Sequence, residues 1–353
     1  MDTQILRRTR CKRLDAAEKR KEIARSEGPP SDTGLLSANL RIRCSVSGPP
    51  GGGPAARIGE YVLLEPVDGG CTLRAVDTRS GEEVVCKVWP LHQCASAFEA
   101  YARVGLHPQL SSPQDILLGA RHTYLFFPRH YGTAHGVLRS YGPVSEACTV
   151  TLFRQMVEAV AHCHACGLVL RDLKLRKFVY SSPEGTKLLL GSLEDAYVLQ
   201  GTDDSLSSRH ACPAYISPEL LSSVSGHPGF AHYSGRCADM WSLGVMLYAL
   251  LTGRYPFQHP TPATLFNKIR SGRYALPDWL SHNARCLLRC LLCREPRERL
   301  TAHEVLGHPW LTAADGPEPV SQDINSPDMA INQGDQLVPD MEDEHPMDMI
   351  SCY

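Results

Sequence analysis

Eight residues, from Leu170 to Lys177, constrain this chain more than any other stretch of its sequence. They read LRDLKLRK and follow a segment, 146–166, whose apolar side chains recur at the spacing of one helix face. Asp172 stands between Arg171 and Lys174, so a carboxylate lies among cations directly after that segment. The pattern predicts a helix that delivers the chain, with this one acidic group, into a loop.

The same residues resemble the catalytic loop of protein kinases, which reads H-R-D-L-x-x-x-N. Arg171, Asp172 and Lys174 fit, and the resemblance implies that Asp172 stands at the place of the catalytic base. Leu170 replaces the opening histidine, however, and Lys177 replaces the closing asparagine. In kinases that asparagine holds a magnesium ion, so a cation stands here in place of a metal ligand. The loop therefore indicates a kinase-like chain that lacks part of the kinase chemistry.

The second magnesium position of a kinase is altered as well. Leu188–Leu190 predicts a buried strand, and the triplet that follows, D-F-G in kinases, is Ser192-Leu193-Glu194 here. A serine hydroxyl is a poor substitute for the aspartate that binds the metal and helps to neutralise the phosphates. We therefore expect no magnesium site and no other metal site in this chain.

The turn that should cover a nucleotide is also changed. The predicted strand Tyr61–Leu64 leads into a turn in which Glu65 and Val67 occupy the first two glycine positions of the family, so only Gly70 is retained. Backbone N–H groups of this turn must approach the phosphates closely, and Pro66 contributes no N–H. We expect ATP binding to be weak or absent.

Lys87, in contrast, is retained. Val84–Lys87 resembles the strand that offers a lysine to the phosphates, and in an active kinase this lysine pairs with a glutamate on the next helix. Glu99 is the only carboxylate between Lys87 and Asp115, in a segment, 91–104, that predicts a short helix. The sequence leaves open whether Glu99 reaches Lys87.

Structural features of the large kinase lobe remain. The run 212–219, CPAYISPE, resembles the kinase run that ends in A-P-E, and Arg299 matches the arginine that usually pairs with its glutamate, here Glu219. Asp239 lies in a segment, 238–244, that resembles the following helix. We therefore predict an α+β, protein-kinase-like two-lobed fold over residues 58–311, with a β-rich small lobe and a helical large lobe used for binding.

The two ends of the chain differ in charge. Residues 1–27 hold nine Lys/Arg and five Asp/Glu, and 28–57 are rich in glycine and proline. Residues 312–353 hold ten Asp/Glu and no Lys/Arg. Such compositions predict solvated, disordered ends, 1–57 and 312–353, that serve interactions. The chain has no apolar run long enough to cross a bilayer, and its net charge is −2, so we expect neither a membrane nor direct nucleic acid as a partner.

Together these residues resemble the Tribbles family of pseudokinases. The resemblance runs in kinase order through about 254 residues. It is carried by Leu170–Val179, Ser192–Asp195, Asp203–Leu206, Ala211–Glu219 and Arg254–Phe257.

The resemblance implies an adaptor in the nucleus and cytoplasm. Tribbles proteins hold substrates such as CCAAT/enhancer-binding transcription factors, which belong to the bZIP class, and recruit a ubiquitin ligase of the constitutive-photomorphogenic type. They also bind MAP kinase kinases, Akt kinases and a stress-induced activating transcription factor. We therefore expect a chain without competent catalytic residues that inhibits kinase signalling and promotes substrate degradation.

Two motifs would carry these contacts. Residues 335–340, DQLVPD, match the family's ligase-binding motif, with Asp335, Gln336, Val338 and Pro339 at its fixed positions. His308-Pro309-Trp310 matches part of the motif that binds MAP kinase kinases, although kinase domains also end in this triplet for packing reasons.

Other functions stay open. The chain can also be read as a slow, metal-independent Ser/Thr kinase that uses Lys87 and Asp172, or as a transcriptional cofactor. A further hypothesis is that the acidic tail docks back onto the short helix after Lys87.

Overall fold

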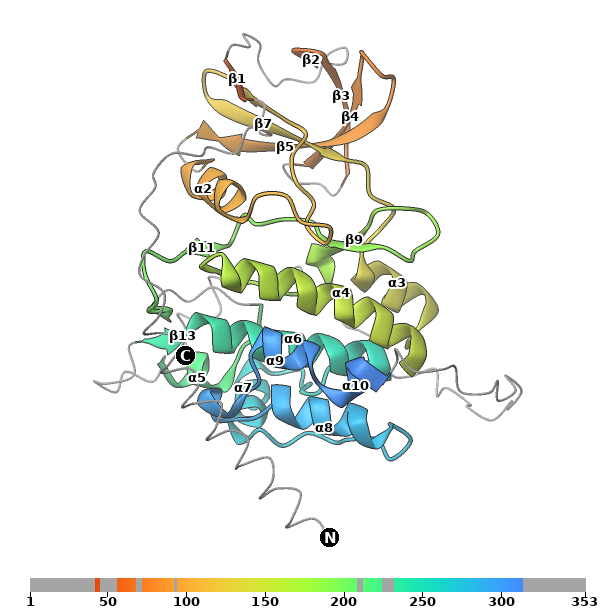
Figure 1. The fold of residues 1–353 in the computed structure, drawn as a ribbon, viewed down its shortest axis with the longest axis vertical. Coiled ribbons are helices and arrows are strands. Elements are labelled where there is room, and N and C mark those ends of the chain that lie inside the picture. Colours follow the sequence, from red (N-terminus) through yellow and green to blue (C-terminus); the bar gives the residue numbers. More distant parts are fainter. Residues whose placement is uncertain are drawn as a thin grey trace. The chain divides into compact units, whose positions relative to one another are not determined.

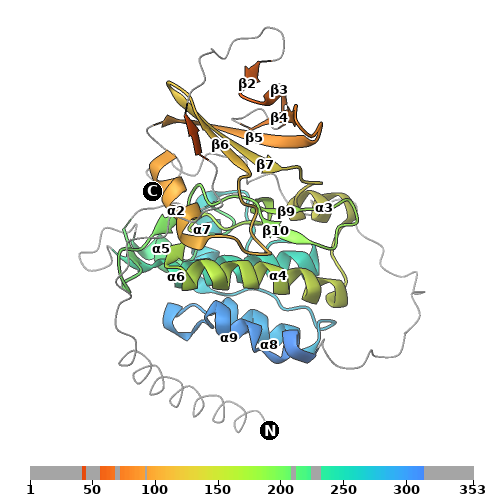
Figure 2. The same ribbon diagram turned by 45° about the horizontal axis from the view of Figure 1, so that its top comes forward.

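The computed structural model describes residues 42–44, 56–67, 72–91, 94–207, 212–223 and 232–313. In this part of the chain a β-rich lobe is followed by a larger helical lobe, as Figures 1 and 2 show. This arrangement confirms the predicted α+β two-lobed fold. The basic segment 1–27, Gly70, and the tail with its 335–340 motif lie outside the described residues.

Seven strands form the sheet of the small lobe, in the spatial order β1-β6-β7-β5-β4-β3-β2. Neighbouring strands pair antiparallel, except that β1 pairs parallel with β6. β1 lies in a segment whose glycine and proline content predicts a linker, so its pairing is a difference from the sequence prediction. The strands are β1 (Ile42–Cys44), β2 (Arg57–Ile58), β3 (Tyr61–Pro66), β4 (Thr72–Asp77), β5 (Glu83–Pro90), β6 (Asp115–Leu118) and β7 (His122–Pro128).

A buried tyrosine of β3 contacts residues of β6 and β7, which are not its neighbours in the sheet. The Tyr61 ring on β3 stacks on Phe126 of β7 with centroids 3.7 Å apart. Its hydroxyl donates to the buried carboxylate of Asp115 at 2.6 Å, and Arg79 donates to the same oxygen at 3.0 Å. A buried carboxylate needs such partners, because leaving it unpaired away from water is costly.

One short helix of the small lobe, α2 (Cys94–Val104), contacts the large lobe. Its Tyr101 is buried, and the tyrosine hydroxyl accepts a hydrogen bond from the backbone N–H of Leu193 at 3.3 Å. At its end, the carbonyl of Val104 lies 2.8 Å from a ring nitrogen of His162. The helix is therefore fixed against the large lobe rather than only against the sheet.

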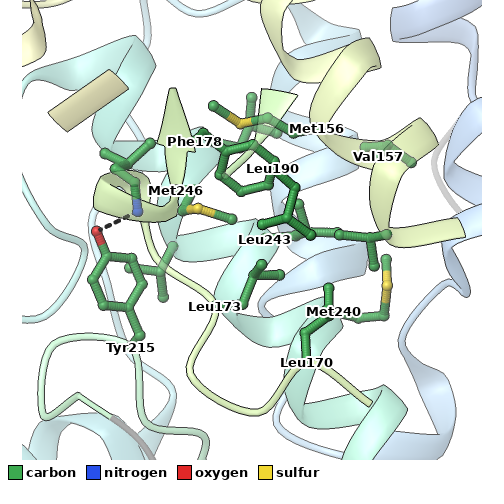
Figure 3. Close-up of a cluster of buried hydrophobic side chains, with 14 of the residues drawn as sticks. Met156, Val157, Leu170, Leu173, Phe178, Leu190, Tyr215, Met240, Leu243 and Met246 are labelled. Atoms are coloured by element: carbon green, nitrogen blue, oxygen red, sulfur yellow. Dashed lines mark hydrogen bonds between the residues drawn. The ribbon is translucent and has the colours of Figure 1, made fainter. Parts of the chain in front are cut away.

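The large lobe is organised around α4 (Glu146–Ala165) and α6 (Gly235–Thr252). Ser145 and Ser234 cap these helices by accepting hydrogen bonds from backbone N–H groups of the first turn. Methionine, leucine and phenylalanine side chains of both helices and of the loop between Leu170 and Phe178 meet in one apolar core, shown in Figure 3. The other helices are α3 (Ala134–Tyr141), α5 (Pro218–Ser223), α7 (Pro262–Ser271), α8 (His282–Leu291), α9 (Ala302–Leu306) and α10 (Pro309–Thr312), with 3₁₀ turns η2 (Leu175–Lys177) and η3 (Pro296–Glu298).

Short strand pairs complete the large lobe. β9 pairs with β10, β8 with β11, and β12 with β13, each antiparallel. Their bounds are β8 (Leu168–Val169), β9 (Phe178–Tyr180), β10 (Leu188–Leu190), β11 (Tyr197–Val198), β12 (Ser205–Leu206) and β13 (Tyr233–Ser234). β8 ends directly before the Leu170–Lys177 loop and β9 begins directly after it, so their pairing with β11 and β10 positions the two ends of the loop. No helix among the described residues has the length and apolar character needed to cross a membrane.

Arg299 and Glu219 form a bidentate ion pair in the large lobe. The two Nη atoms of Arg299 donate to the carboxylate at 2.7 Å, and the arginine also donates to the carbonyls of Cys237 and Cys293 at 2.8 Å. The guanidinium lies 5.0 Å from the centroid of the Trp241 ring. One buried arginine thus ties the end of the A-P-E-like run to α6 and to the turn after α8.

Candidate functional site

A cleft of about 640 Å³ lies at the position where a kinase binds its nucleotide. Val85 of β5 and Val179 of β9 line it from the two lobes. Lys87, Lys177, Ser192 and Glu194 also line it, so the structure brings together four residues that the sequence singles out.

Asp239 positions the loop below the cleft. Its carboxylate is fully buried at the start of α6 and accepts the backbone N–H groups of Leu170 at 2.8 Å and Arg171 at 2.9 Å. A ring nitrogen of His164 lies 2.9 Å from the same carboxylate. Arg171 adopts a φ of 64°, which is unusual for a residue with a side chain and is held here by these contacts. Leu170, in place of the family's histidine, is buried in the apolar core of Figure 3.

Asp172, the candidate base, is surrounded by cations. Lys174 lies 2.9 Å from its Oδ2 atom, and Lys177 lies 3.9 Å from the same atom. The side chain is largely buried, and its Oδ1 atom has no hydrogen-bond partner within the described part of the chain. Asp172 therefore lies in the loop below the cleft, as the kinase resemblance predicts, but its negative charge is offset by Lys174 and Lys177.

Lys177 occupies the place of a metal ligand and forms ion pairs of its own. Its ammonium group donates to the carboxylate of Asp195. Burial raises the pKa of Asp195, but the charge of Lys177 and its hydrogen bond outweigh this, so that the pKa lies below its ordinary value.

The residues present do not fit a magnesium ion. The hydroxyl of Ser192 accepts the backbone N–H of Glu194 at 3.3 Å, and the neighbouring ligand position holds a cation. A hard cation takes oxygen ligands, usually carboxylates, and an ammonium group in their midst repels it. Among the described residues no group of three His, Cys, Asp or Glu side chains could hold a metal.

Glu194 is the partner of Lys87, which settles a point that the sequence leaves open. The lysine donates to the carboxylate of Glu194, whereas Glu99 lies exposed on α2 and pairs with Arg103 at 3.7 Å. Burial by itself would raise the pKa of Glu194. The charge of Lys87 and its hydrogen bond act in the opposite direction, and the pKa lies below its ordinary value. The lysine that would hold phosphates in a kinase is thus held by a carboxylate from the altered triplet.

A chain of charges also spans the β-strands at the cleft. Arg74 donates to Glu65 and to Glu83, and Arg129 pairs with Glu83. Glu65 lies within β3, and the N–H of Val67 donates to the carbonyl of Thr72 at 3.0 Å, so this N–H is not available to a phosphate. Carboxylates on this side of the cleft repel the phosphates of a nucleotide.

The sequence interpretation missed four members of these pairs, namely Asp195, Arg74, Glu83 and Arg129. For Asp195 a signal was available in the sequence. It directly follows Glu194, and the same motifs contain two lysines, Lys87 and Lys177, with which two adjacent carboxylates can pair. Arg74 and Glu83 carried no such signal, because only the pairing of β4 with β5 brings them together.

The His308-Pro309-Trp310 triplet lies far from this chemistry, at the start of α10. Trp310 is only 4% exposed, and its Nε1–H donates to Glu146 at 2.7 Å. His308 is buried and accepts the backbone N–H of Trp310 at 3.1 Å. Pro309 is exposed and so is the member of the triplet that a partner can contact. Asp335, Gln336, Val338 and Pro339 lie outside the described residues.

Comparisons with known proteins identify the family. The protein kinase domain family matches residues 68–311. The chain is 50% identical to Tribbles homolog 3 of Rattus norvegicus over 81% of its own length and 79% of the relative's. It is 52% identical to Tribbles homolog 3 of Homo sapiens over 73% and 70%, and 48% identical to Tribbles homolog 2 of Canis lupus familiaris over 82% and 81%. Identity at this level over most of both chains, on a kinase fold whose two metal-ligand positions hold Lys177 and Ser192, shows that the chain belongs to the Tribbles family of pseudokinases.

Proposed function

We propose that this chain is a non-catalytic adaptor, which holds signalling kinases and transcription factors and does not phosphorylate them. The observation that carries the proposal is that two ion pairs occupy the cleft, one between Lys87 and Glu194 and one between Lys177 and Asp195. A nucleotide would have to replace both carboxylates, and no magnesium ion would be present to neutralise its phosphates. The fold is then useful as a binding surface.

The proposed partners follow from the family. They are MAP kinase kinases and Akt kinases, whose signalling is restrained, and bZIP transcription factors of the CCAAT/enhancer-binding and activating types. A ubiquitin ligase of the constitutive-photomorphogenic type is recruited through Asp335, Gln336, Val338 and Pro339, in the nucleus and the cytoplasm. The match of these residues to the family motif supports this part of the proposal.

A slow, metal-independent kinase is the second candidate. It is favoured by Asp172 and Lys174, which lie 2.9 Å apart in the loop, as a base and its neighbouring cation would. The pairing of Lys87 with Glu194 opposes it, because the lysine is already engaged.

Nucleotide titration separates the two candidates. The full chain is titrated with ATP, first with Mg²⁺ and then with EDTA, while thermal stability and phosphate transfer to a protein substrate are measured. An adaptor shows no transfer in either condition, and any stabilisation by ATP does not depend on Mg²⁺. Phosphate transfer that persists in EDTA and is lost in Asp172→Asn would favour the metal-independent kinase. Magnesium-dependent binding together with transfer that is lost in Asp172→Asn would also overturn the adaptor proposal. If ATP binding is observed, it is measured again in the Glu194→Gln variant, because this variant frees Lys87 from its carboxylate partner.

Ligase recruitment is tested with the double variant Val338→Ala and Pro339→Ala in the full chain. We expect loss of ligase co-precipitation with unchanged capture of the transcription factor, because the two contacts use different parts of the chain. Ligase capture equal to that of the unaltered chain would remove this part of the proposal.

Binding of MAP kinase kinases is tested at Pro309 rather than at Trp310. Removal of the buried Trp310 ring would disturb the fold, whereas Pro309 is exposed. We expect Pro309→Ala to weaken capture of the kinase at an unchanged melting temperature. Unchanged capture would leave the triplet with a packing role alone.

A further inference from the structure

One long stretch of the large lobe contains no acidic side chain. From Met240 to Pro277 the chain has four Lys/Arg and no Asp or Glu. α7 lies inside this stretch, and the short irregular segment 258–261 leads into it. The ammonium group of Lys268 on α7 donates to the carbonyl of Gln258 at 2.9 Å and has no carboxylate partner within the described part of the chain. An added anion near the start of α7 would therefore meet a cation that no acid neutralises.

A threonine of this segment stands in a sequence context that enzymes recognise. Thr261 is followed by Pro262, and a serine or threonine before proline is what proline-directed Ser/Thr kinases modify. The described part of the chain holds three other such hydroxyls, on Ser112, Ser182 and Ser217. Ser217 is buried, and the other two serines are half-buried. Among the described residues, Thr261 is thus the exposed member of this set.

The backbone at Thr261 has a shape that suits modification by a kinase. Its φ of −97° and ψ of 128° are those of an extended chain, and residues 258–261 belong to no helix or strand. A kinase binds its substrate segment in an extended form, so this segment needs little rearrangement. Pro262 is the first residue of α7, and the first turn is the part of a helix that frays most easily. The Thr261-Pro262 pair is therefore accessible in the folded chain.

The unmodified threonine leaves the start of α7 without a side-chain cap. Throughout α7, all of which the structure describes, no backbone N–H donates to the Thr261 side chain. The hydroxyl instead lies 2.8 Å from Nδ1 of His259 and donates to the Thr264 hydroxyl at 3.0 Å. Because Pro262 has no N–H, the first-turn groups that a cap would bind are the N–H groups of Ala263 and Thr264.

We propose that Thr261 is a phosphorylation site for a separate, proline-directed Ser/Thr kinase, and that the phosphate then caps α7. In this reaction the kinase's catalytic carboxylate takes the proton of the Thr261 hydroxyl. A bond forms between Oγ1 and the γ-phosphorus of ATP, the bond from that phosphorus to the oxygen bridging it to the β-phosphate breaks, and ADP leaves. The proposal does not depend on the adaptor function, because this chain is the substrate and not the enzyme.

A phosphate on Thr261 supplies the cap that the hydroxyl does not. It brings a charge of about −1.5 to −2 and three acceptor oxygens. These oxygens can accept the N–H groups of Ala263 and Thr264, at the end of the helix where the backbone dipoles favour an anion. Lys268, which already contacts the carbonyl of Gln258, offsets part of the added charge. Phosphorylation therefore stabilises the first turn of α7 and makes this basic stretch less positive.

Incubation of the full chain with a purified, active MAP kinase, an enzyme of this class, tests the proposal. ATP and Mg²⁺ are added, and phosphopeptides are identified by mass spectrometry. Thr261→Ala removes the hydroxyl, and Pro262→Ala keeps the hydroxyl but removes the proline that the kinase recognises. Ser182→Ala with Ser326→Ala is the matched control, because it removes two other Ser-Pro hydroxyls and keeps Thr261. Melting temperatures establish that all variants are folded.

We expect a phosphate on Thr261 in the unaltered chain and in the control, and its loss in Thr261→Ala and in Pro262→Ala. Hydrogen exchange then compares the phosphorylated chain with the unmodified one. The backbone N–H groups of Ala263 and Thr264 should exchange about fivefold more slowly after phosphorylation, which is the usual effect of a good helix cap. The N–H groups of α8 should exchange at the same rate in both chains, because the phosphate does not cap that helix.

Three outcomes would overturn the proposal. One is the absence of phosphate on Thr261 of the full chain while the same kinase modifies a peptide of residues 254–270, because the fold would then block the site. Another is phosphate on Thr261 without any added kinase, which would assign the modification to the chain itself. A third is unchanged exchange of the first turn of α7 after phosphorylation, which would remove the capping role.

Discussion

The large lobe and the cleft both contain paired charges, but these charges have different roles. In the large lobe, Arg299 connects the turn after η3 to Glu219 of α5, and Asp239 connects α6 to the backbone N–H groups of the Leu170–Lys177 loop. In the cleft, Lys87 with Glu194 and Lys177 with Asp195 fill the positions that a nucleotide and its metal would occupy. The comparison teaches that a kinase fold depends on the first set of contacts and not on the second, so the second set can change while the fold remains.

The physical reason lies in where the charges are. Arg299 and Asp239 are almost completely inaccessible to water, so their partners cannot be removed without leaving an unpaired buried charge. The cleft groups are partly exposed, and water or another side chain can compensate them. The following changes test this difference, from the largest expected effect to the smallest.

Arg299→Ala should lower the free energy of unfolding by about 3–5 kcal/mol, because it leaves the Glu219 carboxylate without its buried partner. Urea denaturation followed by fluorescence measures the change. The double variant Arg299→Met with Glu219→Leu removes both charges and should recover much of the loss. A loss below about 1 kcal/mol for the single variant would show that this pair is no more important than a surface pair.

Gly244→Ala should destabilise the chain by about 1–3 kcal/mol through overpacking, although alanine normally favours a helix. A Cβ at this position of α6 would stand 2.8 Å from the Cβ of Leu291 on α8, which is too close. Thermal unfolding of the two chains gives the difference. If the alanine variant is as stable as the original, the contact between α6 and α8 is looser than its distance implies.

Glu194→Gln should cost about 1 kcal/mol or less at pH 7, because the Glu194 side chain is 36% exposed and water screens its pair with Lys87. The folded pKa of Glu194 is lowered, so its contribution is complete above the ordinary value of 4.5 and is lost as the pH falls through the folded pKa. The stability difference between the two chains should therefore shrink below about pH 4.5. Denaturant titrations from pH 7 to pH 3 measure it, and a difference that grows toward low pH would contradict the assignment.

Glu99→Gln should have the smallest effect, below about 0.5 kcal/mol, because Glu99 makes one exposed contact with Arg103 on the same helix. In an active kinase the glutamate on this helix pairs with the phosphate-binding lysine, and its loss would matter. A destabilisation above about 1 kcal/mol in thermal unfolding would mean that Glu99 also reaches Lys87 in solution.

Much of the fold was predictable because its signals are local. The helical spacing over 146–166, the apolar run Leu188–Leu190 and the order of the kinase-like motifs placed both lobes and the cleft. The replacement of metal ligands at Ser192 and Lys177 was equally visible, since it depends only on which residue stands at a position. The pair of Arg299 with Glu219 was predicted from the kinase resemblance, and the structure contains it. The pairings of the cleft charges were not visible, and the short strand β1 was not anticipated either.

The sequence by itself determined that this chain is a Tribbles-type pseudokinase, because identity and spacing along the chain are enough to show which ligands have been replaced. Only the tertiary structure decided which charges meet in the cleft. Glu194 and not Glu99 pairs with Lys87, and Trp310 is turned into the lobe toward Glu146. Such choices depend on how α2, the altered triplet and α10 pack in three dimensions. A carboxylate 107 residues away can reach the lysine when packing places it there, while one only 12 residues away cannot.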